Sequence, residues 1–344
     1  MGIERVRICV VGMGRAGTLH AKNLLYQIPQ SELIAVVDSI PSQLQKAMSE
    51  LKGKARGFTS LTEALEKVDF DAVIIATSTF THAVLIEEAA RGGKHIFCEK
   101  PLVVTLEECA RVIEVVKSSN MKFQIGFVRR YDFAFQEAKR KIEEGLLGEI
   151  ILIKSTGRGP GLPPEWAWDI QKSNGMLAEV NSHDFDSIRW LIASEFKRVY
   201  AEAGNFKTPE VKRKYTHFYD NAIVTVRFEN GAMGLVDSSC PAGYGYDARV
   251  EILGSKGMMQ IGELKNKGVI LCTQEKGITS SAYRGWPERF EEAYPAEIRT
   301  FIQTILEDRT PSPDAYDGLR TVEVVLAANR SIETGEVQEV KRIL

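Results

Sequence analysis

The strongest constraint on the fold is the regular alternation of short apolar runs and helical patterns over residues 1–126. Runs such as RICVV, LIAVVD and AVIIAT are each followed by a stretch with helical periodicity. Parallel strands need such crossover segments, because a tight turn cannot return the chain to the same end of a sheet. The alternation therefore predicts an α/β fold with an N-terminal Rossmann-type doubly wound parallel sheet, which binds ligands at the carboxyl ends of its strands.

After about residue 150 the pattern changes to strands that follow one another directly. The segment NAIVTVRFENGAMGLVDSS, with a turn at Asn230-Gly231, predicts an antiparallel hairpin. Helical periodicity returns at about 289–307 and 315–334. A chain of 344 residues is long enough for two domains. We expect 1–126 to form the first domain and 127–344 an α+β domain on a mostly antiparallel sheet, with the helix at about 315–334 a candidate to pack back on the first.

Composition excludes several classes of partner. The 44 basic and 46 acidic side chains give a net charge of −2 without a long block of either sign, so we expect no nucleic-acid partner and no membrane partner. No stretch approaches the roughly 18 to 20 apolar residues that span a bilayer. The five cysteines form no CxxC pair, and the N-terminus lacks the features of a signal peptide. These features predict a cytoplasmic protein with reduced thiols.

A glycine-rich loop follows the first predicted strand. VVGMGRAG places Gly12, Gly14 and Gly17 between a strand and a helix, the context that a dinucleotide-binding fingerprint requires. Asp38 ends the next strand, where a carboxylate accepts hydrogen bonds from an adenosine ribose and repels a 2′-phosphate. The alternative is a glycine turn that serves packing alone. We interpret the loop as a cofactor site and expect NAD rather than NADP.

The strand HIFCEK ends in CEKP, which places Lys100 at the sheet edge expected to hold the nicotinamide half of the cofactor. A lysine there can stabilise an alkoxide as hydride leaves, although a solvated lysine before a turn-forming proline is the alternative. Thr77, Ser78 and Glu99 also lie near strand ends and are candidate cofactor contacts. His82 follows the same strand as Thr77 and is either a contact or part of a helix entry.

Several motifs, in order along the chain, resemble one oxidoreductase family. GMGRAG, ATSTFTHA at 76–83, CEKP, GFVRRYD at 126–132 and NSHDFD at 181–186 are similar to the motifs of the Gfo/Idh/MocA oxidoreductases. GFVRRYD, FENGAMGLVDSS and GYGYDARVEILGSKG resemble, more narrowly, its inositol 2-dehydrogenase branch. The resemblance covers nearly the whole chain.

This resemblance implies NAD(P)-dependent oxidation of a secondary alcohol on a sugar or polyol. It also implies a second domain that builds the substrate site and the interface of a homodimer or homotetramer. Lys100 matches the family's catalytic lysine, and His183 matches the histidine that acts as general acid or base. A ketosugar reductase, an aldose dehydrogenase, an NAD-dependent glycosidase and a non-catalytic nucleotide sensor remain alternatives.

The segment AEVNSHDFD surrounds His183 with carboxylates. If MLAEVNSHDFDSIRWLI forms one helix, Glu179 and His183 share a face at i and i+4, and Asp186 can join them. A carboxylate would then hold one imidazole nitrogen while the other meets a substrate hydroxyl. A metal site and a structural histidine are the alternatives, and we expect no metal because hydride transfer to nicotinamide requires none. Glu179 stands where the family pattern has Asp, which leaves the substrate open.

Three further residues are candidate substrate contacts. The resemblance favours Arg129 as a substrate contact over its neighbour Arg130. Adjacent residues on an extended segment point in opposite directions, so we expect the other arginine to make a structural ion pair. The resemblance also favours Tyr246, with a core tyrosine as the alternative. GPGLPPEWAWD is rigid and aromatic, so we expect a loop over the pocket with Trp166 or Trp168 against a sugar face, or simply packed.

Overall fold

The computed structural model describes residues 5–344, apart from the side chains at 266, 267, 269 and 277. By internal contacts the chain divides into two units. Unit 1 runs to Val128 and includes Glu292–Val322 and Ile343–Leu344, whereas unit 2 comprises Arg129–Glu291 and Glu323–Arg342. The domain boundaries expected from the sequence, 1–126 and 127–344, stay a prediction.

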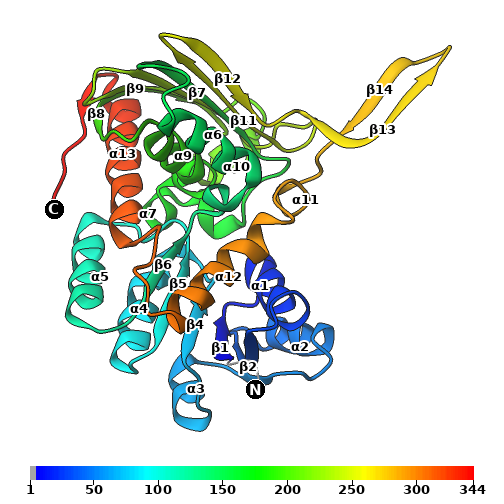
Figure 1. Ribbon diagram of the computed structural model, residues 1–344, viewed down its shortest axis with the longest axis vertical. Coiled ribbons are helices and arrows are strands. Elements are labelled where there is room, and N and C mark those ends of the chain that lie inside the picture. The colour runs from blue at the N-terminus through cyan, green and yellow to red at the C-terminus, as the bar shows by residue number, and fades with distance from the viewer. Residues whose placement is uncertain (1–4) are drawn as a thin grey trace. The chain divides into compact units, whose positions relative to one another are not determined.

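Unit 1 contains a six-stranded parallel sheet with the strand order β3-β2-β1-β4-β5-β6 (Figure 1). The order reverses on either side of β1, which confirms the predicted doubly wound Rossmann sheet. The sequence does not predict the short elements β3 and α3, because they carry too few residues for a recognisable hydrophobic period. The elements of unit 1 are β1 (Val6–Val11), α1 (Arg15–Tyr26), β2 (Ser31–Val37), α2 (Pro41–Glu50), β3 (Arg56–Phe58), α3 (Leu61–Lys67), β4 (Ala72–Ile75), η1 (Thr79–Thr81), α4 (His82–Arg91), β5 (His95–Glu99), α5 (Leu106–Ser118), β6 (Phe123–Gly126) and α12 (Ala293–Leu306).

Helix α12 comes late in the chain but completes the core of unit 1. Ile8 and Val10 of β1 belong to the same buried cluster as Ile298 and Phe301 of α12. Burying a side chain of this size is worth about 1.5–3 kcal/mol, so losing the helix would expose one face of the sheet at a large cost. Figure 1 shows α12 lying beside α1 on that face.

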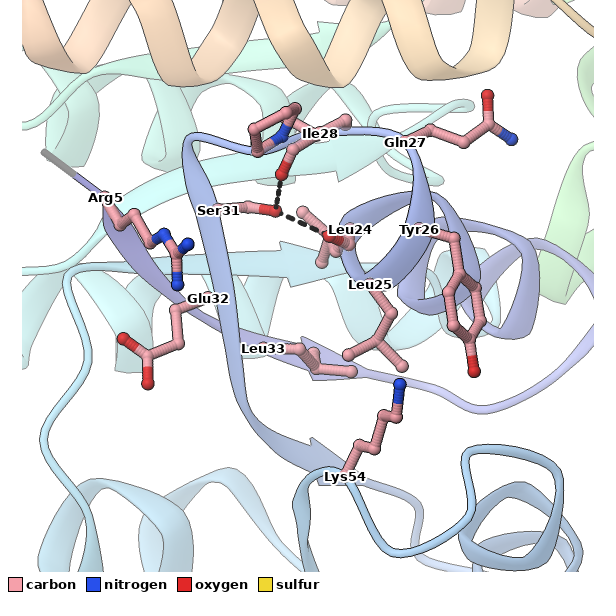
Figure 2. A pocket seen from close by; sticks show the side chains of 11 residues that line it. Arg5, Leu24, Leu25, Tyr26, Gln27, Ile28, Ser31, Glu32, Leu33 and Lys54 are labelled. Carbon is pink, nitrogen blue, oxygen red and sulfur yellow. Dashed lines mark hydrogen bonds between the residues drawn. The ribbon is translucent and has the colours of Figure 1, made fainter. Parts of the chain in front are cut away.

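A hollow of about 470 Å³ opens on unit 1 near the start of β2. Figure 2 shows Arg5, Glu32 and Lys54 around it, and the Ser31 hydroxyl donating to the carbonyls of Leu24 and Ile28 at 2.8 Å. These bonds close the turn from α1 into β2. Because the hollow lies at the amino ends of β1 and β2, it is at the wrong edge of the sheet for a nucleotide.

Unit 2 is built on a seven-stranded sheet with the order β12-β11-β7-β10-β9-β8-β15. Its neighbours pair antiparallel except β10 and β7, which agrees with the mostly antiparallel sheet that we expected. The turn at Asn230-Gly231 joins β9 to β10, and Gly231 has a φ of +90° that favours glycine. Strands β13 and β14 pair only with each other and extend away from the larger sheet (Figure 1).

The strands of unit 2 are β7 (Ile150–Arg158), β8 (Phe196–Gly204), β9 (Asn221–Phe228), β10 (Met233–Ser239), β11 (Asp247–Gly254), β12 (Gly257–Ile261), β13 (Lys265–Thr273), β14 (Gly277–Ala282) and β15 (Gln338–Glu339). Its helices are η2 (Val128–Tyr131), α6 (Phe133–Glu143), η3 (Glu165–Trp168), α7 (Ile170–Ser173), α8 (Gly175–Glu179), α9 (Ser182–Ile192), α10 (Pro209–Lys214) and α11 (Trp286–Arg289). Helix α13 (Ala315–Thr334) contributes residues to both units.

The single helix expected over MLAEVNSHDFDSIRWLI is wrong, because the chain forms α8 and α9 with a break at Val180 and Asn181. The side-chain amide nitrogen of Asn181 donates to the Gly157 carbonyl at 3.3 Å and to Asp184 at 2.9 Å. The side-chain amide oxygen of Asn181 accepts from the Ser238 hydroxyl. An asparagine side chain that bonds in this way offers an alternative to helical backbone. The i, i+4 argument therefore does not place Glu179 beside His183.

Among the described residues, no helix combines the length and the apolar character needed to cross a bilayer.

Candidate active-site residues

The glycine loop of unit 1 has a geometry that only glycine permits. Gly12 has a φ of +91°, and a Cβ there would lie 2.6 Å from the Ala76 carbonyl oxygen. A Cβ at Gly17 would lie 1.7 Å from the carbonyl oxygen of Gly12, so the first turn of α1 packs directly on the loop. These are the close approaches that the fingerprint requires of its first and third glycines.

The same loop leaves space and hydrogen-bond donors for an anion. Gly14 caps α1 without any side-chain cap, and a Cβ there would meet nothing within 4 Å. The first amides of a helix and its dipole attract phosphate. Asp38 accepts from the Met13 amide at 2.8 Å and from the Ile40 amide at 2.9 Å, which holds its carboxylate against the loop. These residues fit a dinucleotide, and the ribose contact of Asp38 stays a prediction.

The charge of Asp38 is expected to control the choice between NAD and NADP. Asp38→Asn keeps an oxygen for the Met13 amide but removes the charge that repels a 2′-phosphate, and such repulsion is worth several kcal/mol. We expect kcat/KM with NADP to rise at least about tenfold while kcat/KM with NAD falls only a few-fold. Steady-state kinetics with both cofactors measures this. An unchanged NADP value, or comparable turnover with both cofactors in the unsubstituted protein, would contradict it.

Lys100 follows β5 directly, at the carboxyl edge of the sheet, and is half-buried. The peptide bond between Lys100 and Pro101 is cis. The buried Glu99 side chain accepts from the Lys100 amide at 3.3 Å. Thr77 and Ser78 follow the neighbouring strand β4 and are also half-buried, so all the expected cofactor contacts of unit 1 lie at one edge of its sheet. Their roles stay predictions.

His82 joins two loops at that edge. It begins α4, and its buried ring places Nδ1 2.9 Å from the Pro101 carbonyl and Nε2 3.2 Å from the Thr77 carbonyl. Burial lowers the pKa of His82, with the carbonyl contacts opposing the shift. Of the two interpretations from the sequence, this position favours the structural one.

In unit 2, His183 lies in the first turn of α9. It is half-buried, whereas each residue around it from Asn181 to Ile188 is buried. Glu179, the last residue of α8, is half-buried as well. The segment therefore leaves one imidazole and one carboxylate partly accessible to solvent. Each of these groups can bind a hydroxyl group, and each can accept or give a proton.

The other carboxylates of the segment point inward to arginines. Asp184 accepts from Arg129 at 2.7 Å, and Asp186 accepts from Arg130 at 2.6 and 2.9 Å. Both arginines lie on the 3-10 helix η2, so the expectation of an extended segment is wrong, whereas the ion pair expected for the second arginine is confirmed at Arg130. Arg130 also stacks on the Trp190 ring. Asp186 therefore serves an ion pair, and Arg129 as a substrate contact stays a prediction.

Asp184 is the centre of a buried polar network. Besides Arg129, its carboxylate accepts from Ser155 of β7 at 2.6 Å and from Asn181 at 2.9 Å. The Tyr246 phenol oxygen accepts a hydrogen bond from the Arg129 guanidinium. Burial raises the pKa of the Tyr246 phenol, and the Arg129 charge opposes that shift. The network joins α9 to the sheet and sets the position of the helix that carries His183.

The aromatic candidates occupy different environments. Tyr246 is 8% exposed and packs edge-on against Phe290. Trp168 donates its indole N–H to the Pro163 carbonyl at 2.9 Å within its own segment, and it packs edge-on against Tyr215 at the end of α10. Trp166 is half-buried in the same 3-10 turn. Tyr246 and Trp166 stay predicted substrate contacts.

Two family models match the chain. Residues 6–127 match the NAD-binding Rossmann fold of an oxidoreductase family, and residues 135–260 match the GFO/IDH/MocA C-terminal domain. The chain belongs to the Gfo/Idh/MocA oxidoreductase family. This membership confirms the family resemblance, the NAD-binding domain and the oxidoreductase class expected from the sequence.

Relatives within the Gfo/Idh/MocA family extend along the whole chain. A myo-inositol 2-dehydrogenase of Thermotoga maritima is 34% identical and covers 95% of this chain and 96% of its own. A scyllo-inositol 2-dehydrogenase (NAD⁺) of Bacillus subtilis is 35% identical, covering 96% and 95% respectively. The crystal structure of scyllo-inositol dehydrogenase from Lactobacillus casei with bound NAD(H) and scyllo-inositol is 30% identical. It has a TM-score of 0.91, covering 98% of this chain and 99% of that one.

For this Gfo/Idh/MocA chain, sequence reasoning missed the partners that hold the candidate residues. The pattern of the segment AEVNSHDFD does not distinguish Asp184 from its neighbouring carboxylates, although Asp184 is fully buried. His20 and Glu297 were not singled out, yet with Glu99 they form the group of potential metal ligands found among residues 5–344. The one available signal for His20 was a polar residue on the buried face of a helix, since Gly17, Ala21 and Leu24 are its buried neighbours.

Proposed function

We propose that the protein is an NAD-dependent dehydrogenase that oxidises a secondary hydroxyl of a cyclic polyol, most like an inositol 2-dehydrogenase. The observation that carries the proposal is the full-length similarity to enzymes named as inositol dehydrogenases, one of them with NAD(H) and scyllo-inositol bound. The glycine loop, Asp38 and Lys100 of this chain support it, because they lie at the edge of the sheet where a dinucleotide binds.

In this proposal Gly12, Gly14 and Gly17 hold NAD, which when bound supplies the hydride acceptor. Lys100 donates a hydrogen bond to the reacting hydroxyl oxygen and stabilises the alkoxide. His183 takes the hydroxyl proton on its ring, which is half-buried in an otherwise buried turn. Glu179 orients His183 or binds a neighbouring hydroxyl, while Arg129, Tyr246 and Trp166 are proposed substrate contacts.

The decisive experiment follows NADH absorbance after NAD is added to purified protein with one polyol at a time. The panel contains myo-, scyllo- and chiro-inositol, glucose and xylose. We expect turnover with at least one inositol and weaker turnover with the aldoses. Turnover with an aldose alone would favour an aldose dehydrogenase, and a blank panel with tight NADH binding would favour a nucleotide sensor. Release of sugar from a glycoside without net NADH would favour the glycosidase.

Glu179 is proposed to set substrate preference. Glu179→Asp restores the family pattern and withdraws the carboxylate by roughly 1.5 Å, the length of one methylene step. A shift of this size changes which hydroxyl it reaches, so we expect the ratio of kcat/KM for two inositol isomers to change about tenfold or more. Kinetics on matched isomers measures the ratio. An equal fall in kcat/KM for both isomers would contradict a role in selectivity.

A homodimer or homotetramer is also part of the proposal. The outer face of the unit 2 sheet carries exposed Ile223, Met233 and Leu253, and the β13–β14 hairpin carries exposed Ile270 and Ile278. Exposed apolar side chains grouped on a sheet favour association. Size-exclusion chromatography with light scattering measures the mass, and a monomer at micromolar concentration would contradict the proposal.

The reduced thiols of the five cysteines support a cytoplasmic location.

A further inference from the structure

Three ionisable side chains meet inside unit 1, next to the residue that precedes Lys100. His20 comes from α1, Glu99 from the end of β5 and Glu297 from α12. One polar atom of each lies within 4.8 Å of the other two. His20 and Glu297 have no exposed surface, and Glu99 is 8% exposed. Charged groups this deeply buried require a specific arrangement of partners.

Glu99 is held from two sides. His20 Nε2 donates to one carboxylate oxygen at 2.7 Å, and the Lys100 amide donates to the other at 3.3 Å. These bonds use both oxygens of Glu99 and fix the side chain between α1 and the backbone of the candidate catalytic lysine.

Glu297 has the opposite environment. Both of its carboxyl oxygens are buried without a hydrogen-bond partner among the described residues. Aromatic rings surround the cluster, with Phe97 and Tyr294 packed edge-on against His20 at 5.5 and 6.0 Å. Burial, and then the negative charge of Glu99, raise the pKa of Glu297 well above 4.5.

Few other groups face Glu297 from the elements that pack against α12. Helix α1 brings His20, and strand β5 brings Glu99. Strand β1 presents apolar side chains to α12, and Gln124 of β6 donates to the Glu297 backbone carbonyl at 3.1 Å. Tyr294, one turn earlier on α12 itself, contacts His20. None of these groups brings a permanent positive charge, so a second ionised carboxylate in this place would lack compensation.

We propose that Glu297 is a neutral carboxylic acid in the working protein, and that it forms with His20 a positioning pair that keeps Glu99 in place beside Lys100. Two carboxyl groups that lie this close, with no positive charge beside them, do not both ionise, so the pair holds one proton. The competing occupant is a divalent cation bound by His20, Glu99 and Glu297. Because His20 Nε2 donates its proton to Glu99, it has no lone pair to offer a cation, which favours one proton held by the two carboxyls.

Stability as a function of pH tests the protonation of Glu297 without any assay of activity. The folded protein keeps the proton, whereas the unfolded chain releases it above about pH 4.5, so this group lowers the stability of the folded state progressively as pH rises. Glu297→Gln has no proton to lose. We expect the Tm of the Gln variant minus that of the unsubstituted protein to grow between about pH 5 and pH 8. A difference that stays flat or shrinks would overturn the proposal.

Infrared spectroscopy detects the proton directly. The protein should show the C=O band of a buried, protonated carboxylic acid at neutral pH, and the band should be missing from Glu297→Gln. Elemental analysis of the purified protein and addition of Zn²⁺ or Mg²⁺ test the competing occupant. Stoichiometric metal together with an absent carboxylic acid band would overturn the proton held by the two carboxyls.

The positioning role rests on the proposed function and needs its own readout. Glu297→Gln should keep kcat within about threefold, because a neutral amide replaces a neutral acid, whereas Glu297→Leu should lower kcat at least about tenfold with little change in KM for NAD. Equal losses in both variants would contradict a neutral Glu297. If no polyol is turned over, the proposed function fails, but the pH dependence of Tm and the infrared band still decide the state of Glu297.

Discussion

Turnover is expected to fall at least about a hundredfold when Lys100 is replaced by methionine or His183 by alanine. Lys100→Met removes the ammonium proposed to stabilise the alkoxide and retains a long side chain at the end of β5. His183→Ala removes the proposed base from the accessible position in the first turn of α9. NAD binding should change little in either variant, because the glycine loop and Asp38 are untouched. Steady-state kinetics and a cofactor-binding titration measure the two quantities.

Matched controls come from the same chain. Lys94→Met makes the same change just before β5, at the amino edge of the sheet, where the ammonium donates to the Phe70 carbonyl at 2.7 Å. His217→Ala removes an exposed imidazole from the loop after α10. Both controls should keep turnover within about twofold. Near-normal turnover in Lys100→Met and His183→Ala would refute the proposed roles.

Replacing Asp184 with alanine is expected to destabilise the protein by about 3–5 kcal/mol, because it leaves the Arg129 guanidinium buried without its carboxylate. Asp184 is fully enclosed, Arg129 is 2% exposed, and the two are 2.7 Å apart. The substitution also leaves Ser155 and Asn181 without their shared acceptor. Urea unfolding, followed by circular dichroism, measures the loss.

Glu251→Gln is the control for this prediction. It removes the Glu251 carboxylate of β11 from its ion pair with Lys154 of the neighbouring strand β7, in which both side chains are well exposed to solvent. Exposed pairs contribute little, so the midpoint of unfolding should hardly move. A loss below about 1 kcal/mol for Asp184→Ala would show that the buried network is dispensable.

Local patterns account for most of unit 1. Strand and helix alternate at short range, and the requirements at Gly12 and Gly17 arise from atoms only a few residues away or on the adjacent strand. The position of Lys100 follows from the same pattern, because a residue that ends a parallel strand must lie at the carboxyl edge of the sheet. Fold class, cofactor and the candidate lysine could therefore be predicted from the sequence.

Long-range partners account for what the sequence left open. The sequence predicts one substrate contact and one ion pair for Arg129 and Arg130, but each pairs with a carboxylate on α9, more than fifty residues away. The break between α8 and α9 depends on Asn181 bonding Gly157 and Ser238 of neighbouring strands. Such contacts exist only after the sheet has formed, so neither periodicity nor spacing predicts them.

The sequence by itself determined the doubly wound sheet, the dinucleotide loop and the family, because each depends on short-range pattern or on motifs in a fixed order. Tertiary structure alone decided which carboxylates are accessible and which are buried: Glu179 remains half-exposed, whereas Asp184 and Asp186 are enclosed. It also brought His20, Glu99 and Glu297 together from three separate elements. The physical reason is that the free energy of a charge depends on the burial and partners that the folded chain provides, and not on its neighbours in sequence.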